Sequence, residues 1–213
     1  LPEETTLIGF AGSPWTVATY MIAGRGTPDQ GPAHALKQND IIAFQGLLDV
    51  IVEATIDYLA SQVEHGAEVL QLFDSWAGSL IGEDFDRFCI APNKSIIDGL
   101  HARGITTPII GFPRGAKDRY VDFAIETGVQ AISIDQDIRL SSVIADLPDT
   151  IVSQGNLDPI CLIDGGQNMF SQIDDIIEAT KGRRHIFNLG HGITQHTPPH
   201  HVSELVYYIR NKG

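Results

Sequence analysis

The sequence has few basic residues, only two cysteines and no long apolar run. Of its 213 residues, 14 are lysine or arginine and 27 are aspartate or glutamate, a formal net charge of −13. We expect no nucleic-acid partner, because a phosphate backbone is bound by a basic surface. We expect no membrane partner, because no stretch approaches the roughly 20 apolar residues that cross a bilayer. Cys89 and Cys161 form no CxxC pair, which favours a reduced, cytoplasmic setting.

The length and composition indicate one globular domain. A chain of 213 residues fits a single domain by length, and 43% hydrophobic with 19% charged residues is ordinary for a globular protein. The first residue is Leu1, not methionine, and a strand pattern follows almost at once. We therefore expect residues 1–213 to be one domain that is truncated at its N-terminus.

The segment 7–26, LIGFAGSPWTVATYMIAGRG, predicts a strand, a tight turn and a helix. Its apolar start ends in small residues, which leave room for a ligand to approach the backbone. Ser13 suits the N-cap of the helix, and Pro14 suits its first turn, where a missing N–H costs nothing. Such corners are where α/β proteins place their chemistry, although a structural turn with a glycine for close packing explains the same residues.

Apolar runs and helical patterns alternate along the whole chain, which predicts a parallel α/β fold. Polar or glycine residues follow five of the expected strands, and this spread favours a barrel over an open sheet. The pattern contains six units, two fewer than a complete eight-stranded barrel. Strands are expected over residues 7–10, 68–74, 107–112, 130–135, 150–155 and 185–189, helices over 15–22, 40–65, 86–103 with an interruption near Pro92, 118–127, 138–147, 171–180 and 201–210, and a loop over 25–32.

Three polar residues near strand ends are candidates for chemistry. His191 lies between two glycines after a strand, where it could reach a ligand or form a loop hydrogen bond. Ser75 could donate to a ligand carboxylate, but capping the next helix is the simpler interpretation. The hydroxyl of Tyr20 could point toward the strand ends, although a tyrosine in a helical apolar pattern more often lines the core.

Other candidates have weaker support. Asp74 and Asp135 each end a strand, so they could act as acid and base or could bind backbone at the turns. A histidine group, His196, His200 and His201, lies on a proline-rich turn without a Cys, Asp or Glu at ligand spacing, so a surface helix start is favoured over a zinc site. No phosphate-binding glycine motif follows a strand, and no GxSxG elbow is present.

Four motifs, in this order and spacing, closely resemble the uroporphyrinogen decarboxylase family: LIGFAGSPWTVATYMIAGRG, LQLFDSWAGSL, SQGNLDP and FNLGHGI. The resemblance covers residues 7–210 and corresponds to the later two-thirds of that enzyme. It implies a (β/α)8 barrel with about six of its eight units in this chain, and a cytoplasmic homodimer. It also implies a decarboxylation without cofactor or metal, in which the four acetate side chains of uroporphyrinogen III become the methyl groups of coproporphyrinogen III.

The resemblance assigns roles to five residues. The active-site tyrosine of the family falls on Tyr20, the serine of its LF[DE]S motif on Ser75, and the histidine of its NLGHG motif on His191. In the family the tyrosine and serine bond to the substrate or to the catalytic carboxylate, and the histidine contacts a substrate carboxylate. Phe10 and Phe73 fall on apolar residues that line the cleft of the family.

The chain also departs from the family pattern. The arginine-rich motif and the central catalytic aspartate of the family have no matching positions here, so we expect these residues alone neither to close the barrel nor to turn over substrate. Two alternatives remain. One is a cobalamin-linked methyltransferase of the same superfamily. Such enzymes carry a zinc site built from His and Cys near the late strands, but no His-x-Cys pattern follows His191 in this chain. The other is a non-catalytic fragment that binds porphyrinogens.

Overall fold

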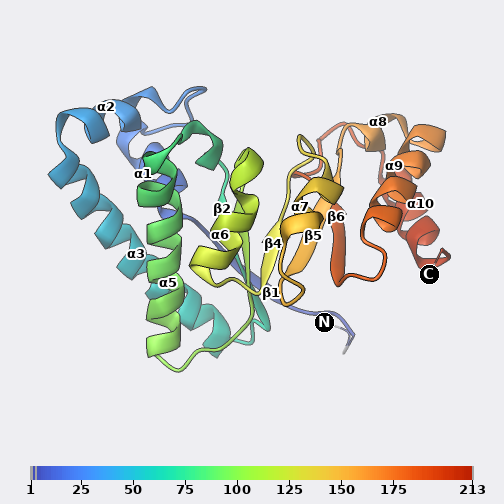
Figure 1. Ribbon diagram of the computed structural model, residues 1–213, viewed down its shortest axis with the longest axis horizontal. Coiled ribbons are helices and arrows are strands. Elements are labelled where there is room, and N and C mark those ends of the chain that lie inside the picture. Colours follow the sequence, from blue (N-terminus) through green and yellow to red (C-terminus); the bar gives the residue numbers. More distant parts are fainter. Residues whose placement is uncertain (1, 3, 213) are drawn as a thin grey trace. The chain divides into compact units, whose positions relative to one another are not determined.

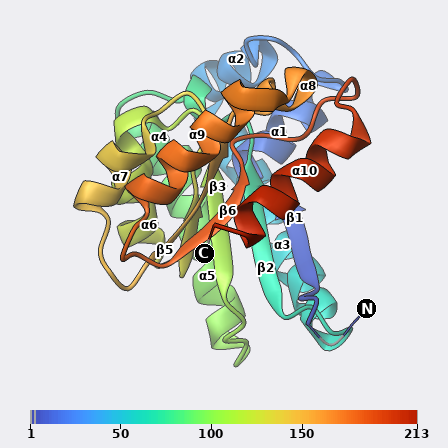
Figure 2. The same cartoon turned by 90° about the vertical axis from the view of Figure 1, so that its right-hand side faces the viewer.

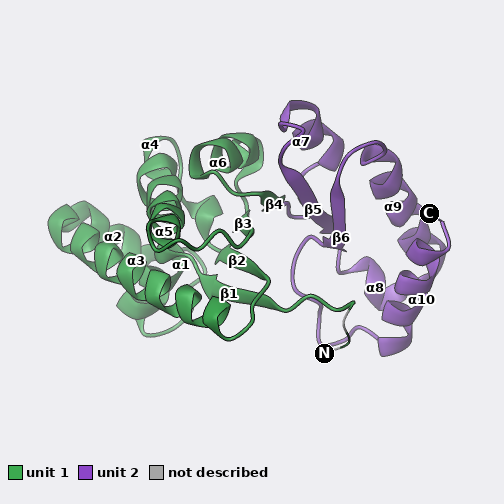
Figure 3. Ribbon diagram, turned by 90° about the horizontal axis from the view of Figure 1, so that it is seen from below, with its two compact units in different colours: residues 1–132 green, residues 133–213 purple. Residues whose placement is uncertain are grey.

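The structure is a computed structural model that describes residues 2 and 4–212. It comprises two compact units, unit 1 (Leu1–Ile132) and unit 2 (Ser133–Gly213), which Figure 3 shows in green and purple. The described residues contain six strands, which pair in sequence order and alternate with helices. This confirms the predicted parallel α/β class.

Unit 1 contains the first three strands and leads into the fourth (Figure 1). Its elements are β1 (Ile8–Gly12), α1 (Pro14–Ala23), α2 (Gly31–Asn39), α3 (Ile41–Glu64), β2 (Val69–Asp74), the 3-10 turn η1 (Ala77–Ser79), α4 (Glu83–Phe85), the π-helical turn η2 (Asp86–Ile90), α5 (Ala91–Ala102), β3 (Ile109–Pro113), the 3-10 turn η3 (Lys117–Arg119), α6 (Tyr120–Thr127) and β4 (Ala131–Ser133).

The strands of unit 1 lie side by side and parallel, as Figure 2 shows for β1, β2 and β3. Their register places Gly12 beside Phe73, and Phe73 beside Phe112. Because side chains alternate between the two faces of a strand, Phe10 lies on the same face of the sheet as Phe73. The opposite face is buried under the helices, with Leu70 and Leu72 almost fully covered.

An aromatic cluster fills the space between the helices of unit 1. The rings of Trp15 and Phe44 lie 5.8 Å apart, and those of Phe44 and Phe88 lie 5.4 Å apart, both edge to face. All three side chains are at most 1% exposed. Edge-to-face pairs of buried rings stabilise a core beyond their buried area, so this cluster joins α1, α3 and η2.

Unit 2 continues the same alternation. Its elements are α7 (Leu140–Asp146), β5 (Val152–Leu157), α8 (Cys161–Asp164), α9 (Gly166–Ala179), β6 (His185–Leu189) and α10 (Pro199–Arg210). Ile134, just after β4, donates its N–H to the carbonyl of Gln154 on β5 at 2.9 Å. Strands β5 and β6 pair in parallel over their length.

All six expected strands are present, and the strand over 185–189 has the predicted bounds. Three helices were missed, the short α4 and α8 and the longer α2, which occupies a region whose glycine and proline content indicated a loop at its start. Pro32 lies in the first turn of α2, where proline is tolerated. The expected interruption near Pro92 is the π-helical turn η2, which directly precedes α5 and places Pro92 in its first turn.

Among the described residues, no helix combines the length and the apolar character needed to cross a membrane. The longest, α3, spans 24 residues and is amphipathic, with Leu48 and Leu59 fully buried and Ile42 82% exposed.

The aromatic cluster predicts a strong effect of truncating Phe44. We expect Phe44→Ala to lower the free energy of unfolding of unit 1 by about 3–5 kcal/mol, the usual cost of removing a buried ring. Urea unfolding followed by tryptophan fluorescence measures this, because both tryptophans, Trp15 and Trp76, belong to unit 1. The control Ile42→Ala, on the same helix but exposed, should change the value by less than about 0.5 kcal/mol. Equal effects of the two changes would contradict the packing described here.

Candidate functional site

The corner after β1 is held to the end of β2 and to α5 by hydrogen bonds. The N–H of Ser13 donates to the carbonyl of Phe73 at 2.8 Å. Ser13 is at the predicted N-cap position, but its hydroxyl makes no capping bond and donates instead to Oδ1 of Asn93 at 2.7 Å. Pro14 lies in the first turn of α1, as predicted. Both Ser13 and Asn93 are fully buried, so this corner is rigid.

Asp74, at the end of β2, is fully buried beneath the same corner. Its Oδ1 accepts a hydrogen bond from the hydroxyl of Thr16 at 2.7 Å, and its Oδ2 faces Nδ2 of Asn93 at 3.4 Å. Burial raises the pKa of Asp74 from 3.8 to about 6, and hydrogen bonds, that of Thr16 foremost, oppose the rise. Asp74 is thus a structural acid, held by side chains from α1 and α5.

Ser75 lies half-buried in the turn after β2. It caps no helix, because the N-cap of the following turn η1 is Trp76, so the capping interpretation is wrong. The turn is fixed on both sides: the N–H of Trp76 donates to the hydroxyl of Thr16 at 3.1 Å, and the indole N–H of Trp15 donates to the carbonyl of Trp76 at 3.1 Å.

The loops after β2 and β3 are in direct backbone contact. The N–H of Gly78 donates to the carbonyl of Arg114 at 2.9 Å, and a Cβ on Gly78 would lie 3.0 Å from the backbone of Gly115. A side chain at position 78 would therefore push the two loops apart. This contact fixes the far end of the turn that carries Ser75.

Tyr20 lies on α1 and is 44% exposed, so it does not line the core. Its ring centroid is 6.4 Å from that of Trp76, the residue after Ser75. On another side the backbone at Gly26 passes close, since a Cβ there would lie 3.3 Å from the tyrosine ring. The structure thus places Tyr20 beside the turn that carries Ser75.

Three phenylalanines form a row across β1, β2 and β3 beside this turn. The rings of Phe10 and Phe73 are 5.9 Å apart, and those of Phe73 and Phe112 are 6.0 Å apart, both edge to face. Phe10 is 60% exposed, whereas Phe112 is buried. The row therefore presents an apolar wall. Of the five predicted site residues, unit 1 contains Phe10, Tyr20, Phe73 and Ser75.

The fifth predicted residue, His191, belongs to unit 2. It follows β6 in an exposed loop, and its Nδ1 accepts a hydrogen bond from the N–H of Gly192. Its two glycine neighbours differ. A Cβ on Gly190 would lie 2.3 Å from the backbone nitrogen of Gln136, whereas a Cβ on Gly192 would meet nothing within 4 Å. Gly190 is thus needed for packing, and Gly192 borders open space.

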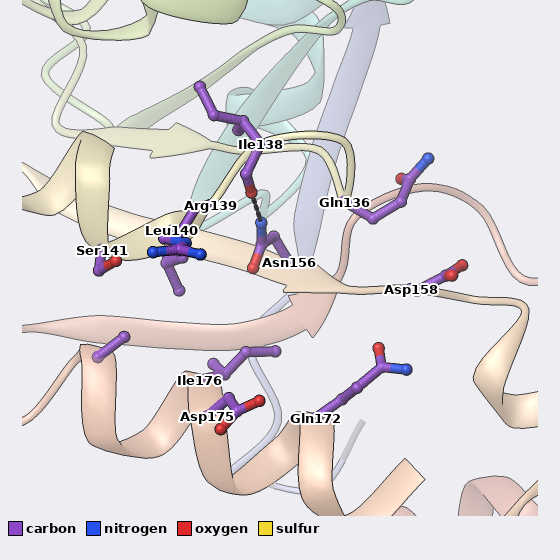
Figure 4. A pocket seen from close by; sticks show the side chains of 11 residues that line it. Gln136, Ile138, Arg139, Leu140, Ser141, Asn156, Asp158, Gln172, Asp175 and Ile176 are labelled. Carbon is purple, nitrogen blue, oxygen red and sulfur yellow. Dashed lines mark hydrogen bonds between the residues drawn. The ribbon is translucent and has the colours of Figure 1, made fainter. Parts of the chain in front are cut away.

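Unit 2 also contains a cavity of about 440 Å³, lined by the loop after β4, the end of β5 and one face of α9 (Figure 4). The side-chain amide of Asn156 donates to the carbonyls of Asp135 and Ile138, both at 2.8 Å, and thereby ties this loop to β5. Asp135 accepts a hydrogen bond from the N–H of Asp137, so it binds turn backbone, the simpler of its two interpretations. None of the five predicted site residues lines this cavity.

Neither the histidine group nor any other group in the described part of the chain has three or more His, Cys, Asp and Glu placed to hold a metal ion. His200 and His201 begin α10, as predicted. The Nδ1 of His201 lies 2.7 Å from the carbonyl of Leu162, so the ring anchors the start of α10 to α8.

The buried polar residues Thr16 and Asn93 were missed from the sequence. Each is a polar residue in a largely apolar helical segment, which is the signal that could have identified them. Their partners are far away along the chain: 58 residues separate Thr16 from Asp74, and 80 separate Ser13 from Asn93.

Comparisons with known proteins match the whole chain. A model of the family described as uroporphyrinogen decarboxylase (URO-D) matches residues 1–212. Proteins named uroporphyrinogen decarboxylase from Paracoccus denitrificans (strain Pd 1222) and Jannaschia sp. (strain CCS1) are 53% and 52% identical to it over 210 and 211 residues. Each match covers 99% of this chain but only 61% and 62% of the relative. The chain thus spans about three-fifths of the length of these curated relatives.

A solved structure supports the fold class. The structure titled methyltransferase from Methanosarcina mazei matches with a TM-score of 0.82 and 19% sequence identity, covering 100% of this chain and 60% of that chain. At this identity the likeness concerns the fold alone. Together with the parallel strands in sequence order, it agrees with the predicted (β/α)8 barrel type, of which this chain contributes about six units.

The buried Asp74 predicts a specific pH dependence of stability. Because its pKa is raised to about 6 in the folded state, its contribution to stability is fully present below pH 3.8 and is lost as the pH rises through 6. We expect Asp74→Asn to remove this loss, on the order of 3 kcal/mol at about 1.4 kcal/mol for each pKa unit. Urea unfolding by tryptophan fluorescence between pH 4 and 7 measures it. Parallel pH profiles of the two proteins would refute the prediction.

The two glycines beside His191 predict opposite outcomes. We expect Gly190→Ala to destabilise unit 2 by about 1–3 kcal/mol, because the new methyl group would overlap the backbone at Gln136. Gly192→Ala should stay within about 0.5 kcal/mol, since its methyl group enters open space. Hydrogen exchange of the β5 and β6 amides, read by mass spectrometry, compares the variants. Equal protection in both would show that Gly190 is not packed as described.

Proposed function

Because the chain belongs to the uroporphyrinogen decarboxylase family, we propose that the protein removes CO2 from the four acetate side chains of uroporphyrinogen III. The product is coproporphyrinogen III, an intermediate of tetrapyrrole synthesis. The observation that carries the proposal for this chain is local. An exposed tyrosine and a half-buried serine, Tyr20 and Ser75, lie on adjoining elements at the carboxyl ends of β1 and β2, beside the wall formed by Phe10 and Phe73.

The proposed chemistry needs no cofactor, because the substrate supplies its own electron sink. Protonation of a pyrrole α-carbon makes the ring cationic. The bond between the acetate methylene and its carboxylate carbon then breaks, CO2 leaves, and the electron pair enters the ring. Protonation of the methylene carbon and loss of the α-carbon proton give a methyl group and restore the pyrrole. The protein must bind the carboxylates and stabilise the cationic ring by preorganised electrostatics.

We assign the polar contacts with substrate to Tyr20, Ser75 and His191. The hydroxyls of Tyr20 and Ser75 would donate hydrogen bonds to a carboxylate, and His191 would contact another carboxylate of the substrate. Phe10 and Phe73 would pack against the tetrapyrrole. Asp74 is given no role as proton donor or acceptor toward the substrate, because its carboxyl group is fully buried and bonded to Thr16.

We further propose that residues 1–213 belong to one barrel domain, and that the protein is a cytoplasmic homodimer that binds neither nucleic acid nor membrane. The domain and dimer proposals rest on the family resemblance, and the charge of −13 supports the exclusion of nucleic acid. Sedimentation equilibrium of the purified protein distinguishes monomer from dimer.

The proposal is tested on an extended protein, defined as this chain joined to the part of the Paracoccus denitrificans relative that lies outside the match. We expect it to convert uroporphyrinogen III to coproporphyrinogen III, measured by chromatography of the oxidised porphyrins. Tyr20→Phe and Ser75→Ala should each lower kcat about 10- to 100-fold, as expected when a hydrogen bond to a charged group is lost. The control Tyr58→Phe, an exposed tyrosine on α3, should leave kcat unchanged.

Two results would count against the proposal. Tight binding of uroporphyrinogen III without product would favour the non-catalytic alternative. Equal kcat values for Tyr20→Phe and Tyr58→Phe would remove Tyr20 from the site while leaving the decarboxylase assignment in place.

A further inference from the structure

We propose that Thr16 is a positioning residue that fixes the turn carrying Ser75 relative to the helix that carries Tyr20. This inference rests on the proposed function and adds a residue to which neither the sequence motifs nor the family resemblance gave a role. Thr16 contacts the two residues that flank Ser75, namely Asp74 before it and Trp76 after it.

A single hydroxyl makes both contacts. Its hydrogen is donated to Oδ1 of Asp74 at 2.7 Å, and its oxygen accepts the backbone N–H of Trp76 at 3.1 Å. The first bond fixes the side chain at the end of β2, and the second fixes the first peptide of the turn beyond Ser75. Together they determine where the backbone of Ser75 lies relative to α1.

The helix that carries Thr16 also carries Tyr20. Thr16 and Tyr20 are four residues apart on α1, so they lie on the same face of the helix about one turn apart. A shift of α1 relative to the turn would disturb the two bonds of Thr16 and would also change the separation of Tyr20 and Trp76, whose ring centroids lie 6.4 Å apart. Thr16 thereby fixes the position of the turn relative to α1.

Burial makes this linkage stiff. Thr16 is 7% exposed and Asp74 is fully buried, so water competes poorly for either bond. Valine has nearly the same shape as threonine but can neither donate nor accept. In Thr16→Val the N–H of Trp76 would lose the hydroxyl that accepts it, and Asp74 would lose the hydroxyl that donates to its Oδ1. Serine would retain the hydroxyl and both bonds.

The chain offers a matched control for the loss of a buried threonine hydroxyl. Thr55 on α3 is also 7% exposed, and its hydroxyl donates to the carbonyl of Ile51 at 2.7 Å, within its own helix. Thr55→Val therefore removes a buried hydroxyl of equal exposure without touching the turn that carries Ser75. A merely structural role of Thr16 would give both valine variants the same effects.

The experiment uses the extended protein defined above, as wild type and as the variants Thr16→Val, Thr16→Ser and Thr55→Val. Hydrogen exchange of the Trp76 backbone amide, resolved by NMR, reports the bond directly. The kinetic constants for uroporphyrinogen III report its consequence. We expect Thr16→Val to speed exchange of that amide at least about tenfold and to lower kcat by about tenfold or more, with KM within about threefold. Thr16→Ser and Thr55→Val should resemble the wild type in both.

Two outcomes would overturn the inference. In one, the Trp76 amide of Thr16→Val stays as protected as that of Thr55→Val. In the other, that amide opens but kcat is unchanged. If the wild-type extended protein forms no coproporphyrinogen III, the proposed function fails separately. The catalytic consequence of Thr16 then falls with it, while the exchange rates still decide whether Thr16 holds the turn.

Discussion

The carboxyl group of Asp74 is the interaction on which the candidate site of unit 1 depends. A carboxylate without partners in a protein interior is strongly unfavourable, so the surrounding elements must supply hydrogen bonds to it. Thr16 from α1 and Asn93 from α5 face its two oxygens, and Asn93 also accepts the hydroxyl of Ser13 after β1. The hydrogen bonds around the buried carboxyl group of Asp74 thus hold α1, α5 and the ends of β1 and β2 in fixed relative positions.

This arrangement separates residues that hold the site from residues that face solvent. The hydrogen-bonded set of Ser13, Thr16, Asp74 and Asn93 is buried, whereas Tyr20 and Phe10 are exposed on the same group of elements. The exposed side chains can contact a large ligand. The buried side chains hold the elements that carry them in place and do not contact the ligand. The raised pKa of Asp74 is a consequence of that burial and does not make it a candidate acid toward substrate.

The acidic character of the chain bears on the proposed substrate. Uroporphyrinogen carries eight carboxylates, so its binding calls for cationic side chains. Arg119, one of the basic residues near the ends of the strands, is already paired with Asp86 and Asp122. The arginine-rich motif of the family has no matching position in this chain, which spans about three-fifths of its curated relatives.

Local patterns in the sequence predicted the strands and the longer helices of this protein, with α2 as the exception. Alternating apolar runs and helical patterns predicted all six strands, and the motif resemblance identified the family to which the chain belongs. Short-range signals were ambiguous where one residue type serves two purposes. Pro32 indicated a loop but opens α2, and Ser75 suggested a helix cap but lies in a turn before Trp76. The position of Ser75 and the exposure of Tyr20 could not be read from neighbouring residues.

The polar groups that are buried together come from distant parts of the chain. Thr16 and Asp74 meet across 58 residues, and Ser13 and Asn93 across 80, because parallel strand pairing brings the carboxyl ends of β1 and β2 to one edge with α1 and α5 beside them. No periodicity or spacing in one sequence encodes such a contact. The class of fold and the candidate residues thus follow from local patterns and motifs, whereas packing sets which side chains are buried and bonded and which are exposed.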